Sequence, residues 1–395
     1  MDKEFPEDLI TDILWRLPIG QWTGRFRCVC KSWRALFSDP SFILREKSVD
    51  PRPQILINSV NNDDERSVYS LYSADTLEPI LPSPVRLPFN EEKPLGDNYN
   101  YRNRVIEIAG SCNGLICIAD GNSDLILWNP ATSETKLVPP SPLRPRWFFE
   151  TVGFGFDPET EDYRIIRQFM YDDGSWGCSY FSEVYCLRND SWTKLADDEN
   201  GYYLPTCDYK MPQCNKGKLY WWRWKWNPGG EPWSLGFVSF AISSHEFRTV
   251  DLRLPSGVDD VRGKLEYLLN EEYMVALFPH KPSDLRCVIT SCEIWVLLKY
   301  WVPESWTKLF VIASPSAEMG ILTFGISRNL KWLILTYRDN CHYNKDDEFL
   351  SAIRPETGDL RDFRDLDIST RRFPVTVINY MPSQVCIRDC YGSSN

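Results

Sequence analysis

The chain has 395 residues, of which 43% are hydrophobic and 25% are charged, as in a globular protein long enough for two or more units. Its net charge of −11 argues against a general nucleic-acid binder, because such a protein needs a basic face to displace phosphate counterions. We expect no membrane partner, because no run approaches the ~20 apolar residues of a membrane span. An acidic N-terminus and 13 cysteines without a CxxC pair indicate the cytoplasm or nucleus.

Residues 4–43 predict a cluster of short helices. Pro6 suits a first helical turn, and apolar residues recur behind it at helical spacing until Pro18 ends the helix. A second apolar set predicts another helix over roughly residues 25–37, and a third short element begins after Asp39-Pro40. So short a segment cannot bury all its apolar surface internally. We therefore expect it to dock on a partner; the alternative is a helical cap packed on the following domain.

This segment resembles a known docking motif. FPEDLITDILWRLP followed by RFRCVCKSWRALFSDPSFI is similar to the F-box in its plant form. The resemblance implies a three-helix unit that binds a Skp-type adaptor and, through it, a cullin and a RING protein. It assigns the adaptor-binding role to Pro6, Leu9, Ile13, Leu14, Leu17 and Pro18 of the first helix and to Phe26, Val29, Cys30 and Trp33 of the second.

The motif departs from the family pattern at two places. Phe5 stands where the family usually has Leu, and residues 20–24 (GQWTG) replace the usual helix opening. Gly24 inside a helix costs roughly 1 kcal/mol relative to Ala. We therefore expect adaptor binding weaker than is typical, with the main apolar anchors retained.

The rest of the chain is repetitive. A strand, a polar turn and a second strand recur six times, beginning at Val68, Leu125, Val184, Phe237, Glu293 and Phe349. Further strands are expected between them, within 110–120, 153–169, 217–222, 272–277 and 321–336. A period near 56 residues with four strands per unit is typical of a β-propeller, and we expect six blades. Segments 53–59 and 375–380 are expected to flank the closure point, in one blade. The alternative is an irregular pair of β-sandwiches.

The same segments resemble the plant F-box-associated domain, whose typical blocks match GSCNGLICI, LWNPATSE and GFGFDPETEDYRIIR in order. Within that family the S-locus and S-locus-like group is the nearest in character. The expected fold is therefore mostly β with an α-helical N-terminus. A three-helix F-box (1–45) precedes a six-bladed, kelch-like β-propeller domain for substrate recognition (46–390).

No catalytic, cofactor or metal site is expected. The three histidines lie in no motif, and the sequence has no GxSxG, GxxxxGK[ST] or HExxH pattern. Cys341-His342 with Cys386 and Cys390 has no known zinc spacing, so these cysteines are expected to pack as small apolar residues. The acids of GFDPETEDYR are expected to be turn residues between two strands.

The binding surface is then expected on loops at one face. In YWWRWKW, Leu219 and Trp221 match a buried family position, whereas Arg223, Trp224 and Trp226 precede the turn 227–230 and are candidate target contacts. Trp147 and Phe148, after a Pro-rich stretch, form a second candidate. The alternative for both groups is packing over a blade.

These features predict a non-catalytic substrate receptor of a Skp-cullin-F-box (SCF) ubiquitin ligase that delivers a target for degradation. Residues 1–45 hold seven Lys/Arg and six Asp/Glu, so residues 46–395 carry −12 and favour a basic target. A basic ribonuclease would fit both this charge and the S-locus resemblance. The alternatives are a non-ligase scaffold bound to the adaptor and a propeller enzyme.

Overall fold

A computed structural model gives the fold of the chain. It describes residues 52–61, 67–81, 107–119, 124–143, 148–172, 178–196, 212–225, 234–252, 266–269, 274–279, 291–297, 306–314, 319–327, 331–339, 348–354, 360–362, 368–369 and 376–390. It also describes the single residues 85, 87, 145, 204, 357 and 358. The expected F-box helices and every adaptor-binding residue assigned above lie outside these ranges. Among the described residues, no helix has the length and apolar character needed to cross a membrane.

The described strands form six four-stranded sheets. Sheet 1 joins β1 (Gln54–Asn61), β2 (Ser67–Ser73), β23 (Ile368–Ser369) and β24 (Thr376–Tyr380). Sheet 2 holds β3 (Glu107–Cys112), β4 (Leu115–Ala119), β5 (Leu125–Asn129) and β6 (Glu134–Leu137), and sheet 3 holds β7 (Phe149–Asp157), β8 (Asp162–Asp172), β9 (Cys178–Cys186) and β10 (Ser191–Lys194).

The other three sheets follow in chain order. Sheet 4 holds β11 (Gln213–Asn215), β12 (Lys218–Lys225), β13 (Ser234–Ala241) and β14 (Glu246–Leu252). Sheet 5 holds β15 (Glu266–Leu269), β16 (Met274–Pro279), β17 (Ser291–Leu297) and β18 (Trp306–Ala313). Sheet 6 holds β19 (Met319–Ile326), β20 (Leu333–Asp339), β21 (Glu348–Ile353) and β22 (Leu360–Asp362).

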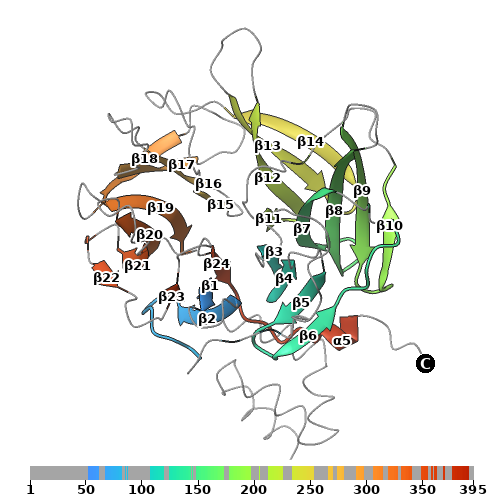
Figure 1. Ribbon diagram of the computed structural model, residues 1–395, viewed down its shortest axis with the longest axis horizontal. Coiled ribbons are helices and arrows are strands. Elements are labelled where there is room, and N and C mark those ends of the chain that lie inside the picture. Colours follow the sequence, from blue (N-terminus) through green and yellow to red (C-terminus); the bar gives the residue numbers. More distant parts are fainter. Residues whose placement is uncertain are drawn as a thin grey trace, which may run out of the picture.

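The sheets follow one another around a common centre (Figure 1). Strand β3 contacts β7, β7 contacts β11, β11 contacts β15, β15 contacts β19, β19 contacts β24, and β24 contacts β3. The innermost strands therefore touch around a closed circle. This arrangement confirms the expectation of a mostly β chain with a propeller arrangement behind the N-terminal segment.

The sequence repeat corresponds to one strand of each sheet. Its six predicted starting residues fall within β2, β5, β9, β13, β17 and β21, and each of the last five is the third strand of its sheet. The other expected strands coincide with β3, β4, β7, β8, β12, β16, β19 and β20. The period of the sequence is thus the period of the sheets.

The two ends of the domain meet in sheet 1. Strand β1 pairs antiparallel with β24, with Leu56 opposite Ile378, which confirms the expectation that both flank the closure point in one sheet. The chain then runs on to sheet 2 and ends its described part in α5 (Ile387–Cys390), beside β6 (Figure 1). The Asn129 amide donates to the carbonyl oxygens of Ser383 (3.1 Å) and Val385 (2.7 Å), which fixes this terminal segment.

Packing between sheets explains which strands are apolar throughout. Every residue of β4 and β5 is buried, because these middle strands have neighbouring sheets on both faces. Outer strands such as β6 alternate between half-buried and exposed residues. One core cluster joins Leu115 and Leu127 of sheet 2 to Phe154 and Tyr185 of sheet 3. The core therefore lies between sheets, and no single sheet can be stable alone.

Candidate functional site

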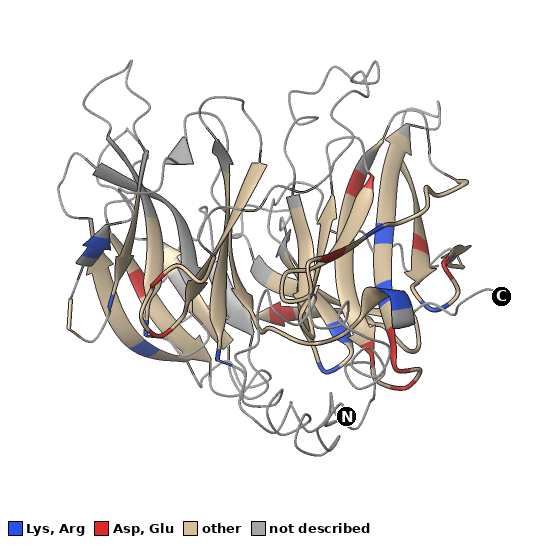
Figure 2. Cartoon of the chain, turned by 90° about the horizontal axis from the view of Figure 1, so that it is seen from below, with Lys and Arg blue, Asp and Glu red and all other residues tan. Residues whose placement is uncertain are grey.

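The connections between strands divide the molecule into two faces. Turns from first to second strand and from third to fourth strand lie at one edge of each sheet, because the strands are antiparallel. Described examples are 113–114, 130–133, 158–161, 187–190, 216–217 and 242–245. We call this edge the short-turn face; in Figure 2 many of its turns lie along the lower side. At the opposite edge, which we call the long-connection face, consecutive strands are separated by more residues along the chain, as between β6 and β7, β10 and β11, and β12 and β13.

Tight backbone geometry characterises the short-turn face. Asn113 (φ 48°) and Gly114 (φ 80°) form the β3–β4 turn in left-handed conformations. A Cβ at Gly114 would lie 2.4 Å from the Ser383 hydroxyl oxygen, so the terminal segment packs directly on this glycine. Ser383 also donates to the Asn113 carbonyl (2.9 Å). Glycine at 114 is therefore required by both conformation and close approach.

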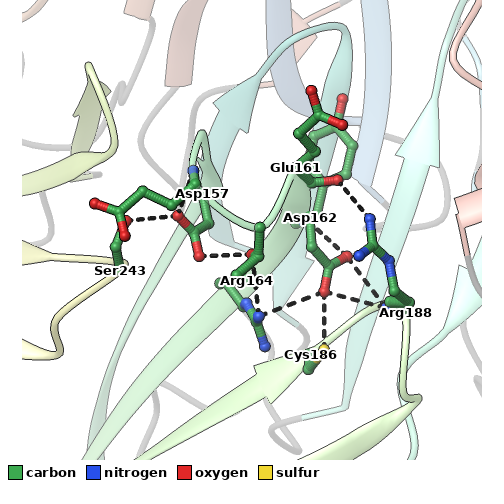
Figure 3. Close-up of polar contacts among 10 residues, drawn as sticks. Asp157, Glu161, Asp162, Arg164, Cys186, Arg188 and Ser243 are labelled. Atoms are coloured by element: carbon green, nitrogen blue, oxygen red, sulfur yellow. Dashed lines mark hydrogen bonds and ion pairs between the residues drawn. The ribbon is translucent and has the colours of Figure 1, made fainter.

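The acidic cluster of GFDPETEDYR lies in the turn between β7 and β8, as expected (Figure 3). The Asp157 carboxylate accepts hydrogen bonds from the hydroxyls of Ser243 and Thr160, both at 2.6 Å, and from the Glu159 N–H at 3.0 Å. Burial opposes ionisation of Asp157, but these donors outweigh it, so its pKa is lowered. Because Ser243 belongs to sheet 4, Asp157 ties two neighbouring sheets together.

Asp162 has a similar structural role within sheet 3. Its carboxylate accepts from the backbone N–H of Tyr163 (2.8 Å) and of Arg188 (3.1 Å) and from the Cys186 thiol (2.8 Å). Arg164 lies 3.8 Å away (Figure 3). Asp157 and Asp162 therefore use their carboxylates to hold the turn in shape.

Among the described residues, no group of three or more His, Cys, Asp or Glu could hold a metal ion. The Cys386 thiol donates a hydrogen bond to Glu134.

The strands next to the two candidate aromatic segments, β7 and β12, lie side by side. A Cβ at Gly153 would lie 2.5 Å from the Trp221 ring, and one at Gly217 would lie 2.7 Å from Pro158. Strand β7 therefore runs antiparallel to β12 of the neighbouring sheet. The start of β7 at Phe149 and the end of β12 at Lys225 consequently lie at the same edge.

The candidate target-contact residues differ in how far the structure describes them. Arg223 pairs with Gly236 and Trp224 with Leu235 near the end of β12, while Trp147 and Trp226 lie outside the described residues. Phe148 is half-buried, and its ring meets that of the fully buried Phe169 edge-on at 4.9 Å. Phe148 therefore packs on the core at least in part, as the alternative interpretation expects.

The neighbouring residues of β12 belong to the core on both faces. Leu219 and Trp221 are 1% and 2% exposed, in agreement with the sequence-based expectation. Trp222, which alternation places on the opposite face, is also buried at 3% and lies 4.3 Å from the Phe237 ring. Both faces are covered because sheet 4 stands between sheets 3 and 5, so Trp221 packs with Ile166 and Trp222 with Met274.

Sequence reasoning missed a buried ion pair beneath this edge. Arg167 donates from Nε (3.1 Å) and from a terminal nitrogen (2.9 Å) to Glu183 Oε1, and the two residues are 1% and 0% exposed. The Ser141 hydroxyl donates to the other Glu183 oxygen at 2.6 Å. The pair therefore anchors the segment that leads to Trp147 and Phe148. A basic residue inside the apolar run RIIRQF was the available signal.

Two known protein families match this chain, one at each part of it. The F-box domain description matches residues 3–45, and the F-box associated beta propeller domain description matches residues 68–387. The chain belongs to the F-box associated β-propeller family. It resembles an F-box/kelch-repeat protein of Arabidopsis thaliana, with 24% identity over 328 residues, which cover 78% of this chain and 79% of that protein.

A second sequence relative and a solved structure also resemble this chain. F-box protein CPR1 of Arabidopsis thaliana is 26% identical over 343 residues, which cover 79% of this chain and 74% of that protein. The β-propeller domain of the Trilobed protease from Pyrococcus furiosus gives a TM-score of 0.34 at 11% identity, covering 66% of this chain and 72% of that chain. A score this low supports no conclusion about fold or function. The two relatives described above are both F-box proteins of a plant.

Proposed function

We propose that this protein is the substrate-recognition subunit of an SCF-type ubiquitin ligase. The observation that carries the proposal is the union in one chain of an F-box match at 3–45 with an F-box associated propeller match at 68–387. In this proposal, residues 1–45 dock on a Skp-type adaptor and residues 46–390 hold the target. The adaptor links the complex to a cullin and a RING protein.

The proposed adaptor contacts are the apolar stripes of the two helices expected from sequence. They comprise Pro6, Leu9, Ile13, Leu14, Leu17 and Pro18, with Phe26, Val29, Cys30 and Trp33. Their spacing supports one continuous apolar surface. Four basic residues within 20–38 (Arg25, Arg27, Lys31 and Arg34), with no acid among them, would favour an acidic adaptor surface.

We infer that the substrate domain is a propeller of six blades. Six four-stranded sheets and the closed circle of innermost strands support this count. In such a ring the long-connection face offers a broad surface to a partner. Arg223, Trp224, Trp226 and Trp147 are the proposed target contacts there, with Phe148 supporting them from beneath.

The charge of the domain indicates the class of target. Residues 46–395 carry a net charge of −12, which would attract a basic protein and speed its encounter in a salt-sensitive way. An S-locus-type receptor for a basic ribonuclease is one specific form of this proposal. The receptor itself would contribute by positioning, because holding the target beside the ligase raises the effective concentration of its lysines.

A pull-down tests adaptor docking. Leu14→Asp with Leu17→Asp places charges in the proposed apolar stripe, and we expect loss of the Skp-type adaptor from the recovered complex. Leu137→Asp is the matched control, because Leu137 is 63% exposed on β6. Equal recovery of adaptor by wild type and the double variant would refute docking through this stripe.

Quantitative proteomics separates a ligase receptor from a scaffold. We expect target proteins to accumulate when the full-length chain is replaced by a version lacking residues 1–45, because binding persists while transfer of ubiquitin stops. A set of protein abundances that does not change on this replacement would favour a scaffold that uses the adaptor alone.

A further inference from the structure

Two cysteines from different sheets meet near the centre of the ring. Cys112 is the last residue of β3 in sheet 2, and Cys214 is the middle residue of β11 in sheet 4. Their sulfur atoms lie 3.6 Å apart, although the residues are 102 positions apart in the sequence. Both residues keep some exposed surface, whereas Cys117, Cys186, Cys292 and Cys386 are buried.

The inner strand of sheet 3 holds the two sulfur atoms in place. Cys112 packs against the core cluster that contains Phe154 of β7. A Cβ at Gly155 would lie 2.8 Å from the Cys214 sulfur, so only glycine leaves room for the thiol at this point. Cys112 and Cys214 therefore approach each other over β7, between two sheets that flank sheet 3.

The hydrogen bonds make the two thiols unequal. The Cys112 thiol donates to the Cys214 sulfur, which also receives the backbone N–H groups of Phe156 and Gly217. These donors stabilise a thiolate at Cys214 and lower its pKa, while the donating role and burial raise the pKa of Cys112. The order of attack proposed below takes Cys214, whose pKa is lowered, as the first nucleophile. By contrast, burial raises the pKa of Cys292 to about 12.

We propose that Cys112 and Cys214 form a reversible oxidation site at which a hydroperoxide converts the two thiols into a disulfide. The Cys214 thiolate would attack the peroxide oxygen, the O–O bond would break, and the departing hydroxide would take up a proton as water. Cys112, losing its proton, would then attack the sulfenic sulfur of Cys214. The S–S bond forms, the S–O bond breaks, and a second water leaves. Two thiols are oxidised by two electrons, and one hydrogen peroxide is reduced to two waters.

The disulfide between Cys112 and Cys214 could form with little movement of the two sulfur atoms, and it would stabilise the fold. The sulfur atoms need to approach by only about 1.5 Å to reach the length of a disulfide bond. The bond would connect β3 to β11 across sheet 3 and close a long loop of the unfolded chain. Such a crosslink should raise the melting temperature by about 5–10 °C. Oxidation would therefore brace the centre of the ring near the short-turn face.

Peptide mapping of the full-length chain tests the site directly. The protein is treated with hydrogen peroxide, free thiols are blocked with N-ethylmaleimide, and tryptic peptides are analysed without reduction. Residues 211–216 contain Cys214 alone, while residues 105–136 contain both Cys112 and Cys117, so fragmentation must assign the bond. We expect a Cys112–Cys214 bond that dithiothreitol removes. Two separately blocked peptides, or pairing of either cysteine with a different one, would overturn the proposal.

Single variants test the order of the reaction. In Cys112→Ser, Cys214 should stop at the sulfenic acid and be labelled by dimedone, and peroxide should no longer raise the melting temperature. In Cys214→Ser, Cys112 should remain largely unlabelled. Cys186→Ser is the matched control, because a hydroxyl can still donate to Asp162 and the paired thiols are unchanged. Equal dimedone labelling of the first two variants would overturn the assigned roles.

Discussion

The two faces of the ring differ in how their connections are held. On the short-turn face, buried side chains satisfy the backbone of tight turns; Asp157 and Asp162 are both 2% exposed, and each accepts several hydrogen bonds. On the long-connection face, described anchors come from the sheet beneath. Ser141 donates to Glu183, and the Leu204 N–H donates to Gln168 at 2.6 Å. Hydrogen bonds within and between the turns therefore hold the short-turn face. A few hydrogen bonds to the buried sheets hold the described part of the long-connection face.

Under the proposed function, this difference separates stability from recognition. Turns whose polar groups are used internally have little capacity left for a partner, whereas longer connections can change sequence without disturbing the sheets. In the proposed receptor, the ring would keep its architecture while the long-connection face adapts to a target. The comparison predicts that variants on the two faces will affect different measurements.

The largest effect on stability is expected at the buried ion pair. Glu183→Ala leaves the Arg167 guanidinium without its closest partner and releases Ser141. We expect a loss of about 3 kcal/mol in the free energy of unfolding, because Glu150, 3.6 Å from Arg167, compensates only in part. Urea unfolding measures this loss, with Glu183→Gln as a control of smaller effect. A change below about 0.5 kcal/mol would show that this anchor contributes little.

In the proposed receptor, target recognition should respond to Trp224 of β12 and to Trp226, which follows β12 in the sequence. Replacing Trp224 and Trp226 by Ser should weaken target recovery by at least about 30-fold, the effect of losing an interface hot spot of 2 kcal/mol. The melting temperature should stay close to that of wild type. A large fall in melting temperature would instead show that both rings pack over the sheet.

On the short-turn face, Asp157→Asn should cost about 1–2 kcal/mol, because it weakens the link to Ser243. The pKa of Asp157 is lowered in the folded state, so its contribution is complete above the unfolded pKa near 4 and is lost as pH falls through the folded value. The stability difference between wild type and variant should therefore shrink below about pH 4. Urea unfolding at several pH values measures it, and a difference that does not depend on pH would contradict this role.

The smallest effect is expected at the rim of the same face. Lys136 lies 3.0 Å from Asp190, whose side chain is 44% exposed. Solvent screens this pair, so Lys136→Met should change the free energy of unfolding by less than about 1 kcal/mol. The change should decrease further in high salt. A larger loss, unaffected by salt, would indicate that packing of the lysine stem dominates.

Repetition made most of the fold predictable. The strands that begin near Leu125, Val184 and Phe237 recur with their polar turns, and the Asp-Pro dipeptide at 157–158 marked a turn that the structure confirms. Pairing of β1 with β24 was also predictable, because a ring needs its ends to join. These features are encoded by local patterns and by one general requirement of closure.

Contacts between distant segments were not predictable in this way. The local sequence does not identify Ser383 as the neighbour of Gly114, Glu183 as the partner of Arg167, or Cys214 as the neighbour of Cys112. Each depends on how neighbouring sheets are placed. The burial of Trp222 was missed for the same reason, because alternation along one strand does not show that a second sheet covers its other face.

The most direct test of the receptor proposal measures target ubiquitination in cells that express wild type, the Leu14→Asp/Leu17→Asp variant or the Trp224→Ser/Trp226→Ser variant. We expect both variants to abolish modification of the same set of proteins for different reasons. The first should keep the target and lose the adaptor, and the second should keep the adaptor and lose the target. Unchanged ubiquitination with both variants would contradict the account.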